Sequence, residues 1–498
     1  MTSLPLTPSR LEFRDLAAKG NLIPIFTEFV ADYETPIGVF EKIDNGARSF
    51  LLESAEGNDR VGRYSFLGSE PRIYFEARGR HILIEQGGQK QEFETPLDPL
   101  AELQRVMGKF RAVTLPDVPP FSGGAVGYMG YDAVRFFEPS VGEAPPDQLG
   151  LPDMVFMVTD TFLVFDHRFR SLKIFANAFV DGGKIDEAYE LGAGKIRRIV
   201  EKLETPTKPR LMNAAPVAVS LSPRSNTSRE EFHEMVCKAK EHIQAGDIFQ
   251  MVPSQRFEAR FDGDPLALYR ALRFINPSPY MFCLRLGDKF ALVGSSPEVH
   301  VRLREGTVEI RPIAGTRKRG ATQPEDERLS AELLADPKER AEHLMLVDLA
   351  RNDVGRIAKY GTVKVTEFMK VERYSHVMHI VSNVVGELRP GYTAYDVMPA
   401  TFPAGTVSGA PKVRAMQLIY EFEKSKRGVY AGAIGYFGFD GQLDSCIALR
   451  TVVLKDGAAY VQAGGGVVAD SEPELEYQES VNKAMASFRA IERAQNIL

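Results

Sequence analysis

Tryptophan is absent from this sequence of 498 residues, and cysteine occurs only three times, as Cys237, Cys283 and Cys446. The three cysteines lie far apart and form no CxxC pair, which argues against a disulfide framework and against a cysteine-based zinc site. Free thiols are typical of a reducing compartment. The sequence therefore predicts a cytoplasmic location.

Long apolar runs and an excess of basic residues are also missing. No stretch of about 18 apolar residues is present to span a bilayer, and the first residues lack the apolar core of a secretory signal. Lys and Arg number 61 against 67 Asp and Glu, which gives a formal net charge of −6. This composition argues against a membrane or a nucleic acid as partner and is typical of a globular protein.

A proline-rich stretch divides the chain into two long segments. Residues 204–227 contain four prolines and few large apolar side chains, so they are predicted to link a domain of residues 1–203 to a domain of residues 228–498. Short alternating runs separated by tight turns predict antiparallel strands, and continuous strands are expected over residues 248–256 and 445–455. Because there is no βαβ rhythm, the fold class is predicted to be α+β, a large antiparallel sheet system flanked by helices.

A helix with two carboxylates on one face is predicted to begin at Pro337, where Asp336 can cap its N-terminus. Glu339 and Glu342 are three residues apart in this helix and are therefore neighbours on its surface. Glu339 could instead complete a capping box with Asp336.

A second helix, predicted from about residue 471 onward, carries Glu476, Glu479 and Lys483 at spacings of three and four. Two helices that each present a pair of carboxylates can hold a hard cation, and Mg²⁺ prefers few carboxylates together with waters and substrate oxygens. The same spacing also describes two solvated helix faces with an ordinary salt bridge between Glu479 and Lys483. Spacing alone leaves both interpretations open.

Two glycine-rich stretches, residues 463–467 and 403–412, each precede a predicted helix. Glycine lets backbone N–H groups come close to an anion, but neither stretch has the spacing of a nucleotide-binding loop. Each is equally compatible with a tight turn.

Four longer motifs resemble the chorismate-utilising enzymes, and most closely the large subunit, component I, of the anthranilate synthase family. They are RPIAGTR at 311–317, AEHLMLVDLARNDVGR at 341–356, FPAGTVSGAPKVRAMQ at 402–417 and YAGAIGY at 430–436. The resemblance extends over residues 22–498. It implies two packed antiparallel sheets with flanking helices, chorismate and ammonia as substrates, and a Mg²⁺ cofactor.

The resemblance also implies a binding site. Glu342 and Glu479 are expected to bind Mg²⁺, with Glu339 and Glu476 supporting them. Arg450 is expected in a strand over residues 447–453, where its guanidinium can hold a substrate carboxylate bidentately. The full set of residues expected to contact chorismate is Gly315, Thr316, Tyr430, Arg450, Gly464, Gly465, Gly466 and Lys483.

Four residues are expected to take part in the chemistry. Glu339 is the candidate donor of a proton to the leaving C4 hydroxyl, and His379 is expected to assist a later elimination. Thr316 and Lys483 complete the set, with Lys483 as an electrostatic anchor for the carboxylates of the substrate.

Two positions distinguish the possible reactions. Relatives that add water to chorismate carry a lysine base where this chain has Gln250, and a glutamine cannot deprotonate water. Many relatives that aminate the other ring carbon carry a nucleophilic lysine where this chain has Ala314. Both residues favour direct amination at ring C2 and loss of pyruvate, which gives anthranilate.

Other reactions and roles remain as alternatives. An aminodeoxychorismate synthase component is the first of them, since some members also lack the lysine. A salicylate or isochorismate synthase is disfavoured by Gln250. A non-catalytic tryptophan-binding paralogue is disfavoured by the intact set of glutamates.

The resemblance implies two partners in addition to the substrates. None of the three cysteines lies in a glycine-rich elbow, so ammonia is expected from a separate glutamine amidotransferase subunit, component II, within a heterotetramer. L-tryptophan is expected as a feedback inhibitor, although the same residues could merely end a strand and form a turn. The expected regulatory residues are Leu52, Glu53, Ser54, Pro279, Tyr280 and Met281.

Overall fold

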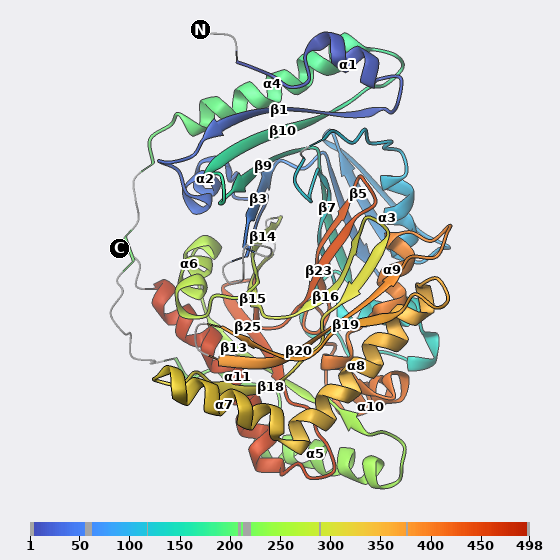
Figure 1. The fold of residues 1–498 in the computed structure, drawn as a ribbon, viewed down its shortest axis with the longest axis vertical. Helices are drawn as coiled ribbons and strands as arrows, with labels where there is room; N and C mark the ends of the chain where they lie inside the picture. The colour runs from blue at the N-terminus through green and yellow to red at the C-terminus, as the bar shows by residue number, and fades with distance from the viewer. Residues whose placement is uncertain are drawn as a thin grey trace.

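The computed structural model describes residues 4–54, 62–116, 118–207, 211–212, 221–287, 290–374 and 377–495. Most of its strands form two large antiparallel sheets that pack face to face, with helices on the outside (Figure 1). The predicted fold class is confirmed.

The first sheet has eleven strands and runs through the first part of the chain into the last. In spatial order its strands are β1 Leu22–Val30, β10 Ser171–Phe179, β9 Thr161–Asp166, β3 Tyr64–Ser69, β2 Arg48–Glu53, β14 Tyr280–Leu286, β15 Phe290–Ser296, β24 Thr451–Lys455, β25 Ala458–Gly464, β13 Ser254–Arg260 and β11 Arg224–Ser225.

The second sheet has twelve strands. In spatial order they are β18 Ile313–Lys318, β20 Val377–Glu387, β17 Thr307–Ile310, β16 Val299–Arg304, β23 Leu443–Ile447, β22 Ala433–Gly438, β7 Gly124–Met129, β8 Met154–Thr159, β4 Ile73–Arg78, β5 His81–Gln86 and β6 Gln89–Glu94, and β19 Lys364–Arg373 pairs with β20. Central β8 (MVFMVT) is buried at every position, because the sheet is covered on both faces, whereas edge strand β6 (QKQEFE) is polar and mostly exposed.

Three large layers of apolar side chains, and a small cluster around Leu333, hold the described sheets and helices together. The middle layer joins the two sheets, and Phe282 of the first sheet and Tyr436 of the second both belong to it. The outer face of the first sheet is covered by α1 Arg10–Leu16, α2 Pro36–Ile43, α4 Ile185–Leu203, α6 Pro265–Ile275 and α11 Pro473–Gln495. The outer layer of the second sheet includes α3 Pro99–Met107, α5 Arg229–Gln244, α8 Pro337–Ile357, α9 Ala394–Thr401 and α10 Lys412–Phe422.

Both halves of the chain contribute to both sheets. Strand β2 pairs with β14 in the first sheet, and β7 pairs with β22 in the second. Residues 1–203 and 228–498 therefore share one pair of sheets, although the sequence suggested a separate domain for each. Much of the predicted linker, residues 208–210 and 213–220, lies outside the described residues, and β11 falls within its described part.

Two runs that were predicted as single strands are broken, and these predictions were wrong. Residues 248–256 divide at Val252 and Pro253 into β12 Gln250–Met251, which pairs with β21 Gly409–Ala410, and β13 of the first sheet. Proline has no N–H to continue a ladder. Residues 445–455 divide between β23 and β24, because the chain crosses there from the second sheet to the first.

Helix boundaries follow the sequence more closely. Ser228 and Glu231 form the predicted capping box of α5. Asp336 caps α8 by accepting hydrogen bonds from the N–H groups of Lys338 and Glu339 at 2.9 and 3.2 Å. Among the described residues, each helix is too short or too polar to cross a membrane.

Candidate active site

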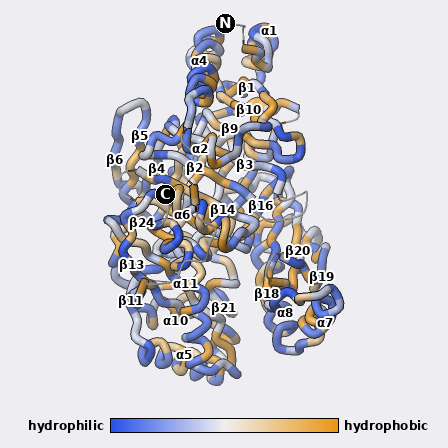
Figure 2. The backbone as a smooth tube through the Cα atoms, turned by 90° about the vertical axis from the view of Figure 1, so that its left-hand side faces the viewer, coloured by the Kyte–Doolittle hydropathy of each residue, from blue (hydrophilic) through white to orange (hydrophobic). Residues whose placement is uncertain are grey.

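Helices α8 and α11 carry the predicted carboxylate pairs and lie on different sheets. Helix α8 packs on β18 and β20, whereas α11 packs on β25. Figure 2 shows α8, β18 and β20 on one side of the lower part of the molecule and α11, α10 and α5 on the other. The site is thus built where the ends of the two sheets meet.

The acidic side chains of the two helices lie close enough for the charge of one to raise the pKa of another. Burial and the charge of Glu339 raise the pKa of Glu342, and the charge of Glu479 adds to this effect. Burial also raises the pKa of Glu476, and Glu479 contributes again. The structure therefore brings all four predicted glutamates into one electrostatic neighbourhood, with Lys483 at 2.6 Å from Glu479.

The carboxylates of this neighbourhood are the residues that could hold a divalent cation. Glu476 Oε1 accepts a hydrogen bond from Ser471 at 2.7 Å, but its Oε2 is buried and has no partner among the described residues. Within the described ranges, no three acidic, histidine or cysteine side chains come together as a complete metal shell. Mg²⁺ takes most of its ligands from water and substrate, so one carboxylate from each helix, Glu342 and Glu479, fits its preference.

Glu339 pairs with Arg317, although the sequence suggested a capping box with Asp336 or a place beside the Mg²⁺ ligands. Its Oε1 lies 2.9 Å from Nη1 of Arg317, and the same guanidinium contacts Asp336 at 2.9 Å. The alternative of a reciprocal capping box with Asp336 is therefore not formed. The contact with Arg317 occupies Glu339, which argues against Glu339 as the proton donor.

The glycine-rich loop after β25 packs directly against the carboxylates. A side chain at Gly465 would place its Cβ 2.9 Å from Glu476 Oε2 and 3.5 Å from Glu479 Oε1. Lys483 Nζ donates to the carbonyl of Gly464 at 3.1 Å. Residues 464–466 must therefore lack side chains to reach this position, which explains the glycine run better than a simple turn does.

Gln250 stands beside the same loop. Its Nε2 donates to Glu342 Oε1 at 3.3 Å, and a Cβ at Gly466 would come within 2.4 Å of that nitrogen. Its Oε1 is buried and has no partner among the described residues. Gln250 thus presents an amide acceptor next to the carboxylates, where a lysine would present a base.

Strands β18 and β20 place three further predicted residues together. Gly315 adopts φ +69° and forms a bulge next to Ala314, and its position faces Glu339. His379 Nδ1 lies 3.0 Å from the Gly315 carbonyl and 3.1 Å from Thr316 Oγ1. A carbonyl only accepts, so Nδ1 carries the hydrogen and Nε2 is the proton-accepting atom of the neutral ring.

Arg450 does not lie in a strand, and this prediction was wrong. It occupies the crossover between β23 and β24 with φ +47°, a conformation that a strand excludes. The crossover is tied to the segment after Tyr430, because the Ala431 N–H donates to the Ala448 carbonyl at 3.1 Å. The two predicted chorismate contacts, Arg450 and Tyr430, are therefore anchored on adjoining segments.

Sequence reasoning missed Glu298, which precedes β16. This carboxyl is fully enclosed, burial raises its pKa to about 8, and Thr406 Oγ1 donates to it at 2.7 Å. It lines a small internal cavity together with Leu346, which lies one turn along α8 from Glu342. A lone glutamate after Ser-Ser-Pro carried no spacing signal, so only the fold could reveal a neutral carboxylic acid here.

The six predicted regulatory residues come together elsewhere. Residues 52–54 of the segment ending β2 and 279–281 at the start of β14 line one cavity of about 1040 Å³ between the sheets. Glu53 itself is buried and accepts hydrogen bonds from Ser65 and Tyr269. We call this space the inter-sheet cavity.

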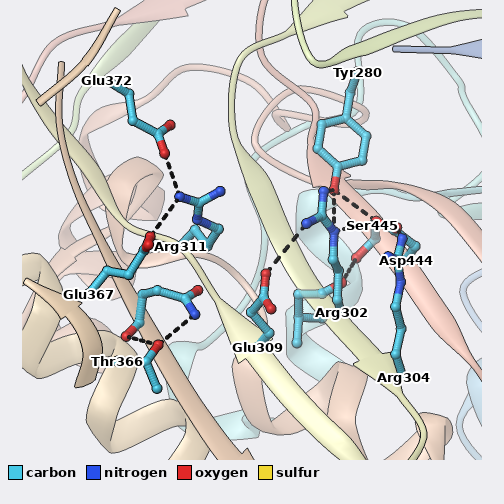
Figure 3. Close-up of polar contacts among 12 residues, drawn as sticks. Tyr280, Arg302, Arg304, Glu309, Arg311, Thr366, Glu367, Glu372, Asp444 and Ser445 are labelled. Carbon is cyan, nitrogen blue, oxygen red and sulfur yellow. Dashed lines mark hydrogen bonds and ion pairs between the residues drawn. The ribbon is translucent and has the colours of Figure 1, made fainter. Parts of the chain in front are cut away.

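Charged side chains of the second sheet, Arg302, Arg304 and Asp444, line one side of the inter-sheet cavity. Figure 3 shows their polar contacts with Tyr280. The Tyr280 hydroxyl donates to Asp444 Oδ1 at 2.8 Å and accepts from Nε of Arg302 at 2.9 Å. Asp444 also pairs with Arg304 at 2.6 Å, and these two arginines help to keep the pKa of its buried carboxyl low. Tyr280 thus links the first sheet to β16 and β23 of the second.

The chain belongs to the family of chorismate binding enzymes, whose sequence pattern matches residues 49–489. Within this class, it is 50% identical over 485 residues, or 97% of each chain, to anthranilate synthase component 1 of Aquifex aeolicus. It is 49% identical over 495 residues to anthranilate synthase component 1 of Acetivibrio thermocellus, which covers 98% of this chain and 99% of that one.

Two solved structures have the same fold as this chain. The crystal structure of anthranilate synthase component I from Streptococcus pneumoniae superposes with a TM-score of 0.76 at 38% identity, covering 92% of this chain and 98% of that one. The menaquinone-specific isochorismate synthase of Escherichia coli shares the fold, with a TM-score of 0.71 at 17% identity over 97% of this chain and 100% of that one.

Proposed function

We propose that this chain is the large subunit of an anthranilate synthase and that it converts chorismate and ammonia into anthranilate, pyruvate and water. The relatives named anthranilate synthase component 1 support this choice over their full length. The observation that carries it is Gln250, an amide hydrogen-bonded to Glu342 where a water-adding enzyme needs a base.

The substrate is held between the glycine loop and the crossover. Mg²⁺ would be held by Glu342 and Glu479, with Glu339 and Glu476 beside them, and when bound it supplies positive charge for a substrate carboxylate. The Arg450 guanidinium is suited to the second carboxylate. The remaining contacts proposed for chorismate are Gly315, Thr316, Tyr430, Gly464, Gly465, Gly466 and Lys483.

Amination comes first. Ammonia attacks ring C2, the ring double bonds shift, and the C4–O bond breaks. Gln250 Oε1 is a buried acceptor that can take one ammonia N–H and so aim the nitrogen lone pair at the ring. Glu298 is the better proton donor for the departing hydroxide, because its raised pKa keeps it protonated at neutral pH whereas Glu339 is paired with Arg317.

Elimination follows. The aminated intermediate loses its C2 proton and its enolpyruvyl group, which leaves as pyruvate, and the ring becomes aromatic. His379 is placed to accept that proton through Nε2, because its Nδ1–H is directed to Gly315. Ala314 offers no nucleophile, which disfavours a route through a covalent enzyme intermediate.

Ammonia comes from a separate glutamine amidotransferase subunit in this proposal. Cys283 and Cys446 are buried, and burial raises the pKa of the Cys446 thiol to about 12. Cys237 is exposed on α5, and no glycine-rich elbow activates it. The purified chain should accordingly use ammonium salts and not glutamine, and glutamine-dependent turnover would contradict this.

L-tryptophan is the proposed inhibitor, with the inter-sheet cavity as its site. Ser54 is placed for the polar head of an amino acid, while Pro279 and Met281 offer apolar surface to an indole. The cavity wall reaches β16, the strand that follows Glu298, so a ligand there is physically connected to the proposed proton donor. Tryptophan and chorismate should then weaken each other's binding by the same factor.

Product analysis tests the proposal. The chain is incubated with chorismate, MgCl₂ and ammonium, and with EDTA in a matched control, and the products are identified by mass and by anthranilate fluorescence. Anthranilate and pyruvate in equal amounts are expected. Aminodeoxychorismate would instead identify the alternative amination, isochorismate or salicylate would identify water addition, and unchanged chorismate with bound tryptophan would identify a non-catalytic paralogue.

A further inference from the structure

A buried ion pair lies behind the proposed active site and takes no part in the mechanism above. Arg427 is 3% exposed and Glu423 is 7% exposed, and both belong to the segment between α10 and β22. Their side chains meet through two hydrogen bonds, Nε to Oε2 at 2.9 Å and Nη2 to Oε1 at 2.6 Å. Burial of such a pair adds little net stability, because desolvation offsets the attraction.

The guanidinium of Arg427 also donates to two other segments of the chain. Its Nη1 donates to the Val407 carbonyl at 2.7 Å, and its Nη2 donates to the Val252 carbonyl at 2.5 Å. Val407 follows Thr406, the hydrogen-bond partner of Glu298. Val252 lies two residues after Gln250, in the break between β12 and β13.

The pair reaches two further parts of the site. The Arg427 guanidinium lies 5.5 Å from the ring centre of Tyr430. Glu423 Oε1 accepts from the backbone and the hydroxyl of Ser254 at 2.9 and 2.8 Å, and Ser254 pairs with Gly464 at the start of the glycine loop. The ion pair therefore contacts residues 252–254 and Val407 directly, lies beside Tyr430, and is linked to Gly464 through Ser254.

We propose that Arg427, oriented by Glu423, is a positioning residue that sets the distances between Gln250, the Thr406–Glu298 pair and Tyr430 in the active site. This inference rests on the proposed function. The planar guanidinium of arginine can donate hydrogen bonds to Glu423 and to both carbonyls from separate nitrogen atoms. The ammonium group of lysine has a single nitrogen and cannot reach all three acceptors in this arrangement.

The test compares Arg427→Lys with Arg285→Lys. Arg285 serves as the control because it is likewise a mostly buried arginine paired with carboxylates, those of Asp44 and Asp264, at the end of β14 away from Tyr280. For Arg427→Lys, kcat/KM for ammonium per folded molecule should fall at least tenfold, and the control should stay within twofold of wild type. The basic limb of the pH–rate profile should also move to higher pH, since the Thr406 hydrogen bond that lowers the pKa of Glu298 is loosened.

Hydrogen–deuterium exchange gives a readout that does not depend on turnover. In Arg427→Lys, exchange should quicken at residues 250–254 and 405–408 and stay unchanged in α4. Should the lysine variant not fold, the double variant Glu423→Gln, Arg427→Gln replaces it, because it leaves no buried charge unpaired.

Each result decides between the explanations. Wild-type kcat/KM in a folded Arg427→Lys, an equal loss in the control, or unchanged exchange at both segments would overturn the positioning role. A wild-type chain that makes no anthranilate would refute the proposed function. Hydrogen–deuterium exchange at residues 250–254 and 405–408 would then still test whether Arg427 holds these two segments in place.

Discussion

Replacing Glu298 by glutamine should change how stability depends on pH. Glu298 is fully enclosed, and burial raises its pKa from the ordinary 4.5 to about 8. The folded state therefore keeps this proton up to about pH 8, whereas the unfolded chain releases it near pH 4.5. Between these values the folded protein binds more protons, so its free energy of unfolding falls as pH rises. Glutamine keeps the shape and removes the titration.

The expected size follows from the pKa difference. One pKa unit corresponds to about 1.4 kcal/mol, so this single group should cost wild type about 3 kcal/mol between pH 5.5 and 7.5. The free energy of unfolding of Glu298→Gln should fall less than that of wild type over the same pH interval, by about this amount. Proton donation would also be lost, and the variant should turn over chorismate about 10²–10⁴-fold more slowly.

Calorimetry at pH 5.5, 6.5 and 7.5 measures the stability effect, with Glu305→Gln as a control because Glu305 lies on the exposed turn after β16. The melting temperature of wild type should drop relative to Glu298→Gln as pH rises, and the control should follow wild type. Parallel curves for all three proteins would show that Glu298 is already ionised at neutral pH. The reasoning on burial, and with it the proposed proton donor, would then fail.

Three further predictions follow from the same geometry. Glu342→Gln should abolish Mg²⁺-dependent turnover yet raise the melting temperature of the metal-free protein above pH 5, because its raised pKa means that the charged form is disfavoured in the fold; a lower melting temperature would contradict this. His379→Met should slow elimination more than amination, so that the aminated intermediate accumulates and is detected by mass, and an equal fall of both products would remove His379 from that step. Ser54→Phe should place a ring in the part of the inter-sheet cavity beside Pro279 and Met281 and raise the tryptophan concentration for half-inhibition at least tenfold with little change in KM for chorismate, whereas unchanged inhibition would place the inhibitor elsewhere.

The sequence by itself determined the fold class, the family and the helices that carry the glutamates. Capping residues and i, i+3 spacing are local signals, which is why α8 and α11 could be placed with Glu339, Glu342, Glu476 and Glu479 on them. The two stretches that form the inter-sheet cavity were also identified, but only through a family resemblance and not through any local pattern.

The tertiary structure alone decided which strands pair and where the chain changes sheets. Alternation of apolar residues shows that a strand has a buried face and does not show its neighbour, so the shared sheets and the crossover at Arg450 were unpredictable. The same limit applies to Glu298 and Arg427. Their burial, and hence the neutral acid and the hydrogen bonds from Arg427 to Val252 and Val407, arises from elements distant in sequence that close around them, and no local spacing encodes that enclosure.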